Sequence, residues 1–174
     1  MPVTFVLGGA RSGKSAYAQR GAEAVGGSRS PLMIATAQAF DDEMRERIAR
    51  HQGERGDAWR TIEAPLELPD ALDQLGPQDV AVADCLTLWL TNLILGDHDV
   101  AKARDALLRS VRHTPARLWL VSNEVGLGIV PDNALSRRFR DEAGRLHQAL
   151  AAQADEVVLI VAGLPLRVKP ATSP

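Results

Sequence analysis

Short apolar segments alternate with longer amphipathic ones along the chain of 174 residues. Each apolar segment is bounded by polar or turn-forming residues, a pattern typical of strands that are buried on both faces of a parallel sheet. The expected strands are residues 4–9, 31–37, 79–85, 117–123 and 156–163, and residues 164–169 can add a short last strand after a tight turn. Helical periodicity predicts helices at residues 14–25, 41–51, 66–75, 86–95, 99–113 and 134–153. This alternation predicts an α/β domain with a mostly parallel sheet and helices on both of its faces.

The segments form one uninterrupted series, which indicates a single domain. No internal repeat or long linker divides residues 1–169, and we expect residues 170–174 to be a disordered tail. The net charge of −2 argues against nucleic acid as the main partner. A single cysteine, Cys85, excludes an intrachain disulfide. No stretch approaches the ~18 apolar residues of a membrane span, so we expect a soluble cytoplasmic protein.

Residues 8–15, GGARSGKS, match the phosphate-binding signature G-x-x-x-x-G-K-[ST] between an expected strand and an expected helix. Glycines let backbone N–H groups turn onto phosphate oxygens, and the helix N-terminus adds partial positive charge. We expect Lys14 to reach the β- and γ-phosphates of a nucleotide and Ser15 to bind Mg²⁺. The predicted nucleotide-binding loop (the P-loop) comprises Gly8, Gly9, Ala10, Arg11, Ser12, Gly13, Lys14 and Ser15.

A second oxygen ligand for Mg²⁺ is expected from Asp84, which lies at the end of an apolar strand. An acid in that position is typical of the Walker-B element of P-loop proteins. A carboxylate at a strand end can also serve as a cap or turn residue. The P-loop creates a need for a metal ligand, and that need favours the metal role.

Three classes of P-loop protein compete for this sequence. A GTPase switch needs an N-K-x-D element, and the chain contains no Asn-Lys pair. A small-molecule kinase needs only the P-loop, Mg²⁺ and a substrate pocket. A nucleotidyltransferase with a covalent intermediate also needs a nucleophile.

One histidine at the end of the expected helix 41–51 is a candidate nucleophile. Met44, Ile48 and His51 are spaced by four and three residues and therefore share one face of the helix. The same position is also explained by a favourable interaction of His51 with the helix dipole, so the residues alone leave both interpretations open. The other histidines have no comparable setting: His98, His113 and His147.

Taken together, these segments resemble one known family. The similar stretches are GGARSGKS (8–15), IATAQAFDDEMRERIARH (34–51), WRTIEAP (59–65), DCLTLWLTNL (84–93), residues 122–151 and ADEVVLIVAGLPLRVK (154–169). The family is the bifunctional adenosylcobinamide kinase / adenosylcobinamide-phosphate guanylyltransferase of cobalamin biosynthesis. The block 41–63 and the segment NEVGLGIVP are specific to it, whereas the P-loop is generic. The resemblance implies a RecA-like P-loop NTPase fold, a corrinoid substrate, ATP and GTP as nucleotide substrates, Mg²⁺ and a homotrimer.

The resemblance also implies roles for individual residues. The histidine that becomes guanylylated in the family lies in an R-I-x-x-H pattern, which matches Arg47, Ile48 and His51 in this chain. Further nucleotide contacts are implied for Ala35, Thr36, Ala37, Gln52, Gly53, Glu54, Arg55, Glu63 and Asp84. The chain departs from the family pattern at Gly56, where proline is usual, and at His147, where asparagine is usual.

The implied chemistry has a phosphoryl transfer, in which Lys14 stabilises the γ-phosphoryl group, followed by attack of His51 on the α-phosphorus of GTP. We hypothesise that Gly53 and Gly56 form a hinge that lets the His51 helix approach the P-loop. Glu124 could accept a proton or orient a water, or it could be an ordinary surface acid. Residues 86–95 could line a substrate wall or a subunit interface, although core packing explains them more simply. The alternative function is a P-loop kinase without guanylyl transfer.

Overall fold

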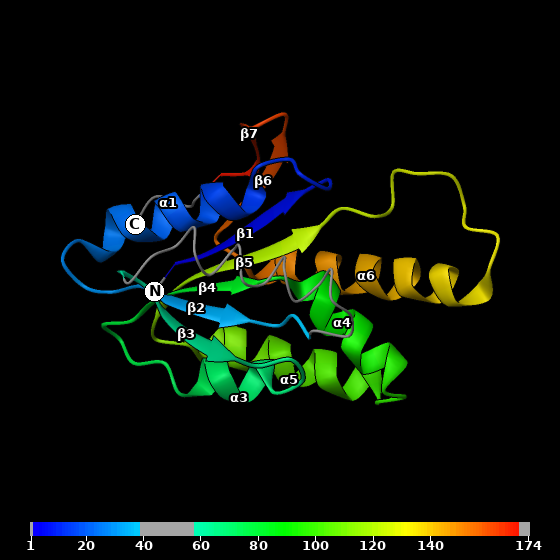
Figure 1. Ribbon diagram of the computed structural model, residues 1–174, viewed down its shortest axis with the longest axis horizontal. Coiled ribbons are helices and arrows are strands. Elements are labelled where there is room, and N and C mark those ends of the chain that lie inside the picture. Colours follow the sequence, from blue (N-terminus) through cyan, green and yellow to red (C-terminus); the bar gives the residue numbers. More distant parts are fainter. Residues whose placement is uncertain (1, 39–57, 171–174) are drawn as a thin grey trace.

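A single seven-stranded sheet forms the centre of the computed structural model, which describes residues 2–38 and 58–170 (Figure 1). Its strand order is β3-β2-β4-β5-β1-β6-β7, and every neighbouring pair is parallel except β6 with β7. The strands are β1 (Val3–Gly8), β2 (Leu32–Ala35), β3 (Arg60–Glu63), β4 (Val80–Asp84), β5 (Arg117–Asn123), β6 (Glu156–Val161) and β7 (Leu164–Lys169). The helices are α1 (Lys14–Gly26), α3 (Leu68–Asp73), α4 (Leu86–Leu95), α5 (Val100–His113) and α6 (Ala134–Gln153).

Helices cover both faces of the sheet, as the sequence predicts. Helix α1 lies on one face, and helices α3, α4, α5 and α6 lie on the other (Figure 1). Two apolar clusters fill the space between the layers, one centred on Phe5, Leu118 and Leu120 and the other on Val6 and Val121. Alternate residues of β1 and β5 therefore point into opposite clusters, which explains why consecutive residues in the middle of both strands are apolar.

One strand was not expected from the sequence. Strand β3 pairs only with β2, at the edge of the sheet. Its residues Arg60, Thr61 and Glu63 are exposed and only Ile62 is partly buried, so it lacks the apolar run that identifies the central strands. The expected helix 41–51 lies outside the described residues.

The remaining predictions agree with the structure apart from element ends. The strand expected at 31–37 ends at Ala35, and the helix expected at 66–75 is the shorter α3, with Pro69 in its first turn. Strand β7 forms where the sequence allows a short last strand, antiparallel to β6. Helix α4 is a core helix: Leu86, Trp89, Leu90 and Leu93 are all buried.

Close packing of α1 onto β5 fixes the direction in which the P-loop enters the helix. A Cβ atom at Gly21 would lie only 2.9 Å from Nε1 of Trp119, so a residue without a side chain is needed at this contact. Glu23 accepts a hydrogen bond from Nε1 of Trp59 at 3.0 Å and ties α1 to the segment before β3. Over the ranges 2–38 and 58–170, no helix has the length and hydropathy needed to cross a membrane.

Candidate functional site: a phosphate-binding loop at the carboxyl edge of the sheet

The P-loop connects β1 to α1 at the carboxyl edge of the sheet, as predicted. Helix α1 begins at Lys14, and its N-cap residue Gly13 has a φ of 93°, a conformation that favours glycine. No side chain caps this helix end, so its first N–H groups stay available for an anion. Lys14 is buried, and its Nζ donates to the carbonyl oxygen of Gly9 at 3.2 Å. The ammonium therefore lies across its own loop, in the position from which it can reach a bound phosphate.

Gly8 is the residue at which the loop is packed most tightly. A Cβ atom there would lie 2.4 Å from Oγ of Ser12 and 2.8 Å from the carbonyl oxygen of Ile160. The loop is also tied to the β6–β7 turn, because Gly163 N–H donates to the carbonyl oxygen of Ser12 at 2.9 Å. At Gly9, by contrast, a Cβ atom would meet nothing within 4 Å. The first glycine of the motif is thus required for packing, whereas the second has open space around it.

These two glycines provide a matched pair of variants. We expect Gly8→Ala to destabilise the fold by about 1–3 kcal/mol, because the new methyl group must displace backbone. At ~2–4 °C per kcal/mol for a domain of this size, the melting temperature should fall by several degrees. Gly9→Ala should leave the melting temperature nearly unchanged in the same thermal unfolding experiment. Equal melting temperatures for the two variants would contradict this account of the loop.

The carboxyl ends of three neighbouring strands bring together three of the predicted nucleotide-site residues. Ala35 of β2 is in register with Glu63 of β3 on one side and with Asp84 of β4 on the other. Two interstrand spacings separate the backbones of Glu63 and Asp84, about 10 Å. Asp84 is partly buried and Glu63 is exposed. Both carboxylates therefore lie at the same edge of the sheet as the P-loop.

Thr36 has a role in the protein interior. It is fully buried, its Oγ1 donates to the carbonyl oxygen of Cys85 at 2.7 Å, and the same oxygen accepts from Cys85 N–H at 2.9 Å. Asn92 of α4 donates to the carbonyl oxygens of Thr36 and Pro65, each at 2.9 Å. The Thr36 hydroxyl therefore holds the ends of β2 and β4 together. Of the predicted trio, Ala35 and Ala37 are both partly exposed, and Ala35 also packs against the core, whereas Thr36 is buried.

Charged groups around the end of β4 affect the pKa of the buried thiol of Cys85. Burial raises its pKa, the neighbouring Asp84 carboxylate raises it further, and Lys14 lowers it. The thiol is therefore protonated near neutral pH and is not a nucleophile. Since Asp84 and Lys14 both act on the same sulfur, the two predicted phosphate and metal residues lie within electrostatic reach of one point.

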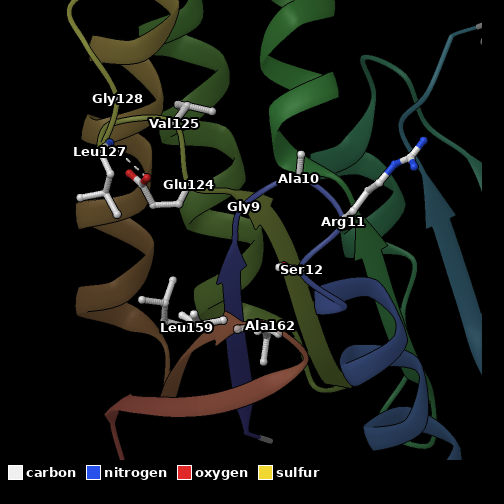
Figure 2. A pocket seen from close by; sticks show the side chains of 12 residues that line it. Gly9, Ala10, Arg11, Ser12, Glu124, Val125, Leu127, Gly128, Leu159 and Ala162 are labelled. Carbon is white, nitrogen blue, oxygen red and sulfur yellow. Dashed lines mark hydrogen bonds between the residues drawn. The ribbon is translucent and has the colours of Figure 1, made fainter.

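An open pocket of about 650 Å³ adjoins the P-loop (Figure 2). Its walls are the loop 9–12, the segment 124–128 and the end of β6. Arg11 points away from the Glu124 wall in Figure 2. The Glu124 carboxylate accepts hydrogen bonds from the N–H groups of Gly126 at 2.7 Å and Leu127 at 3.2 Å. Glu124 thus stabilises its own loop. The sequence leaves open whether Glu124 takes part in catalysis or is an ordinary surface acid, and these hydrogen bonds support a structural role.

His147, where the chain departs from the family pattern, lies beneath this edge of the sheet. Its Nε2 is 2.8 Å from Oγ of the buried Ser122, and its ring packs against Phe5 with centroids 5.6 Å apart. Burial lowers the pKa of His147 to about 4, although the Glu124 carboxylate opposes this effect. His147 is therefore a partly buried, neutral residue bonded to Ser122, in agreement with the expectation that it has no catalytic setting.

This depressed pKa predicts a pH dependence of stability. An unfolded histidine has a pKa of about 6.5. Between pH 6.5 and 4, His147 is therefore protonated in the unfolded chain but stays neutral in the folded protein. We expect the free energy of unfolding to fall by about 3 kcal/mol across this window, relative to a His147→Asn variant that can still bond to Ser122. Urea titrations of both proteins at several pH values measure this difference. Parallel curves for the two proteins would show that His147 is not the group responsible.

Five predicted site residues lie outside the described residues: His51, Gln52, Gly53, Glu54 and Arg55. Their roles and the proposed hinge at Gly53 and Gly56 stay predictions. Sequence reasoning missed Asn123, the last residue of β5, which is in register with Gly8 of the P-loop. The available signal was a polar residue at the carboxyl end of an apolar strand, the same signal that identified Asp84.

Comparison with known proteins places these features in one family. Residues 4–168 match the family model described as CobU, "Cobinamide kinase / cobinamide phosphate guanyltransferase". The chain is 50% identical over 168 residues to the bifunctional adenosylcobalamin biosynthesis protein CobP of Pseudomonas aeruginosa, covering 95% of this chain and 96% of the relative. It is 42% identical over 181 residues to the bifunctional adenosylcobalamin biosynthesis protein CobU of Salmonella typhimurium, covering 95% of this chain and 98% of the relative.

A solved structure supports the fold separately. An ATPase domain of known structure superimposes with a TM-score of 0.54 at 11% identity, covering 99% of this chain and 78% of that one. This likeness concerns the fold alone and confirms the predicted P-loop NTPase architecture. Because the family model matches residues 4–168, nearly the whole chain, the chain belongs to the cobinamide kinase / cobinamide phosphate guanyltransferase family, whose members are bifunctional enzymes.

Proposed function

We propose that this protein phosphorylates the hydroxyl group of adenosylcobinamide with ATP or GTP and then transfers GMP from GTP to the phosphorylated product. The observation that carries the proposal is the P-loop with buried Lys14, at the same sheet edge as Asp84, in a chain of this family. The product of the two steps is adenosylcobinamide-GDP. A plain small-molecule kinase remains the alternative, since the P-loop alone would serve it.

The first step is a phosphoryl transfer for which the P-loop supplies the electrostatics. The substrate oxygen attacks the γ-phosphorus, the bond to the β–γ bridging oxygen breaks, and the nucleoside diphosphate leaves. Lys14 and the uncapped N–H groups of α1 neutralise the charge that develops on the phosphate oxygens. These groups are held in place before the nucleotide binds, so little reorganisation is needed during the reaction.

The second step attacks a different phosphorus atom of GTP. The neutral imidazole of His51 displaces pyrophosphate from the α-phosphorus and forms a phosphoramidate, and the phosphorylated substrate then displaces the histidine. The P-loop binds the departing pyrophosphate with the same donors that it uses in the first step. Gln52, Gly53, Glu54, Arg55 and Glu63 are assigned to the nucleotide on the strength of the family resemblance.

The donor set at the sheet edge fits Mg²⁺. Ser15 lies in the first turn of α1 and Asp84 ends β4, and both offer the hard oxygen ligands that Mg²⁺ prefers. The described residues contain no group of three or more His, Cys, Asp or Glu side chains that could form a protein cage, and Mg²⁺ in kinases is held largely by phosphates and water. When bound, the ion would be held by Ser15 and Asp84 and would neutralise the negative charge of the phosphate groups.

We also infer a cytoplasmic homotrimer. The cytoplasm supplies the ATP and GTP that the reactions consume. The edge strand β7 exposes Leu164 and Leu166, and the segment after β5 exposes Leu127 and Ile129, which is 98% exposed. Large apolar side chains exposed on these two segments support burial against other subunits. Light scattering of the purified protein gives its mass in solution and tests the trimer.

The proposed function is tested with GTP labelled at either the α- or the γ-phosphate, together with Mg²⁺ and adenosylcobinamide. Transfer of γ-label to the corrinoid demonstrates the kinase, and transfer of α-label demonstrates the guanylyltransferase. Transfer of γ-label alone would establish the plain kinase instead. Absence of both transfers, with the nucleotide still bound, would refute an enzymatic function for these substrates.

A further inference from the structure

Only two buried side-chain polar atoms within residues 2–38 and 58–170 lack a hydrogen-bond partner; one lies in the P-loop, and the other belongs to a residue whose backbone lies beside it. They are Oγ of Ser12 and Oδ1 of Asn123. Buried polar atoms without a partner are rare in proteins, because each costs free energy of desolvation. Ser12 belongs to the P-loop itself, so its hydroxyl is already expected to meet a phosphate. Asn123 belongs to no part of the site that the sequence identified.

The backbone of Asn123 lies directly beside the start of the P-loop. Asn123 is in register with Gly8, and the following N–H, that of Glu124, donates to the carbonyl oxygen of Gly8 at 3.0 Å. Strand β5 lies between β1, which carries the P-loop, and β4, which ends in Asp84. The backbone of Asn123 therefore lies between the start of the P-loop and the strand that ends in Asp84.

The far end of the Asn123 amide is held by a neighbouring hydroxyl. Its Nδ2 lies 3.1 Å from Oγ1 of the buried Thr87, and the same Oγ1 lies 3.0 Å from Sγ of Cys85. Because a hydroxyl can donate or accept, the amide can turn over without losing its contact with Thr87. In the turned orientation Oδ1 accepts from Thr87, and Nδ2 becomes a donor in the place of the oxygen atom that has no partner.

We propose that Asn123 binds the γ-phosphoryl group of the bound nucleoside triphosphate, with Thr87 holding its amide in place. This inference rests on the proposed function only in taking the P-loop as a triphosphate site. A donor between the P-loop and Asp84 meets the terminal phosphate and not the β-phosphate, which the loop amides surround. Asn123 would then distinguish a nucleoside triphosphate from a diphosphate.

Calorimetric titration with a non-hydrolysable GTP analogue and with GDP, both with Mg²⁺, tests this assignment without any turnover. For Asn123→Ala we expect affinity for the analogue to fall about 10- to 100-fold, the range of a hydrogen bond to a charged group, while affinity for GDP changes little. Asn123→Asp should lower the affinity for the analogue further, because a negatively charged carboxylate would then face the phosphate. An equal loss for both nucleotides, or no loss for either, would overturn the assignment.

Variants of Thr87 give a second and independent measurement. Thr87→Val keeps the shape but removes the hydroxyl, so discrimination between the GTP analogue and GDP should decrease. Thr87→Ser keeps the hydroxyl and should retain most of the discrimination between the two nucleotides. If Asn123→Ala does not fold, the two Thr87 variants still test the proposal. Identical discrimination between the GTP analogue and GDP in Thr87→Val and Thr87→Ser would refute the proposal that Thr87 holds the Asn123 amide in place. Loss of discrimination in a protein without kinase activity would refute the proposed function and leave this inference standing.

Discussion

Replacing Lys14 by methionine is expected to abolish both activities while leaving the protein folded. Methionine keeps much of the aliphatic length, so the buried position stays filled, but the ammonium that we expect to face the phosphates is lost. Removing one preorganised charge-stabilising donor typically costs about 10²–10³ in kcat. We expect a loss of at least this size in γ-phosphoryl transfer, and a comparable loss in guanylyl transfer, because the departing pyrophosphate uses the same site. Steady-state rates with each labelled nucleotide measure both.

Lys102 provides the matched control for this variant. It is an exposed lysine in the first turn of α5, on the opposite face of the sheet from α1. Lys102→Met removes the same charge from the chain and should leave both rates unchanged. If Lys14→Met lowered only the kinase rate, the pyrophosphate of the second step would have to be bound elsewhere, and the shared use of the P-loop would be wrong.

The sequence predicted the central part of the sheet because burial on both faces leaves a direct pattern. Strands β1, β4, β5 and β6 each contain a run of consecutive apolar residues, and the P-loop motif lies between a recognisable strand and helix. Strand β3 escaped prediction because only its pairing with β2 holds it in the sheet, and its exposed residues carry no periodic signal. A strand that is defined by its neighbour cannot be identified from its own residues alone.

The site was predictable where a motif fixes the local backbone and less so where tertiary contacts decide. Gly13 and Lys14 lie as the P-loop motif requires. Thr36 looked like a ligand-facing residue, yet the approach of Cys85, which is 49 positions away in the sequence, takes up its hydroxyl. Asn123 became visible only once the strand order placed β5 between β1 and β4. Neither contact can be derived from local sequence.

The second large effect is expected from His51→Ala, which separates the two activities. The family resemblance predicts that His51 is the covalent nucleophile, and neither Cys85 nor His147, the thiol and the imidazole that the described residues place nearest this edge, is suited to that role. Cys85 is buried with a raised pKa, and His147 is bonded to Ser122 in the interior. Removing the nucleophile should lower guanylyl transfer by at least about 10³-fold, because no alternative route to a covalent intermediate remains. Phosphoryl transfer should change far less, since it uses Lys14 and not the histidine.

The covalent intermediate itself can be detected directly. Incubation with α-labelled GTP and Mg²⁺, followed by denaturation, should leave label on the wild-type protein that is labile in acid and stable in base, as expected for a phosphoramidate. His51→Ala should carry no label, whereas His98→Ala, which removes an exposed histidine near the end of α4, should be labelled as the wild type is. Label that survives in His51→Ala would show that another residue is the nucleophile. Guanylyl transfer without any label would indicate direct attack by the phosphorylated substrate, and the P-loop would then have to hold both reactants at the same time.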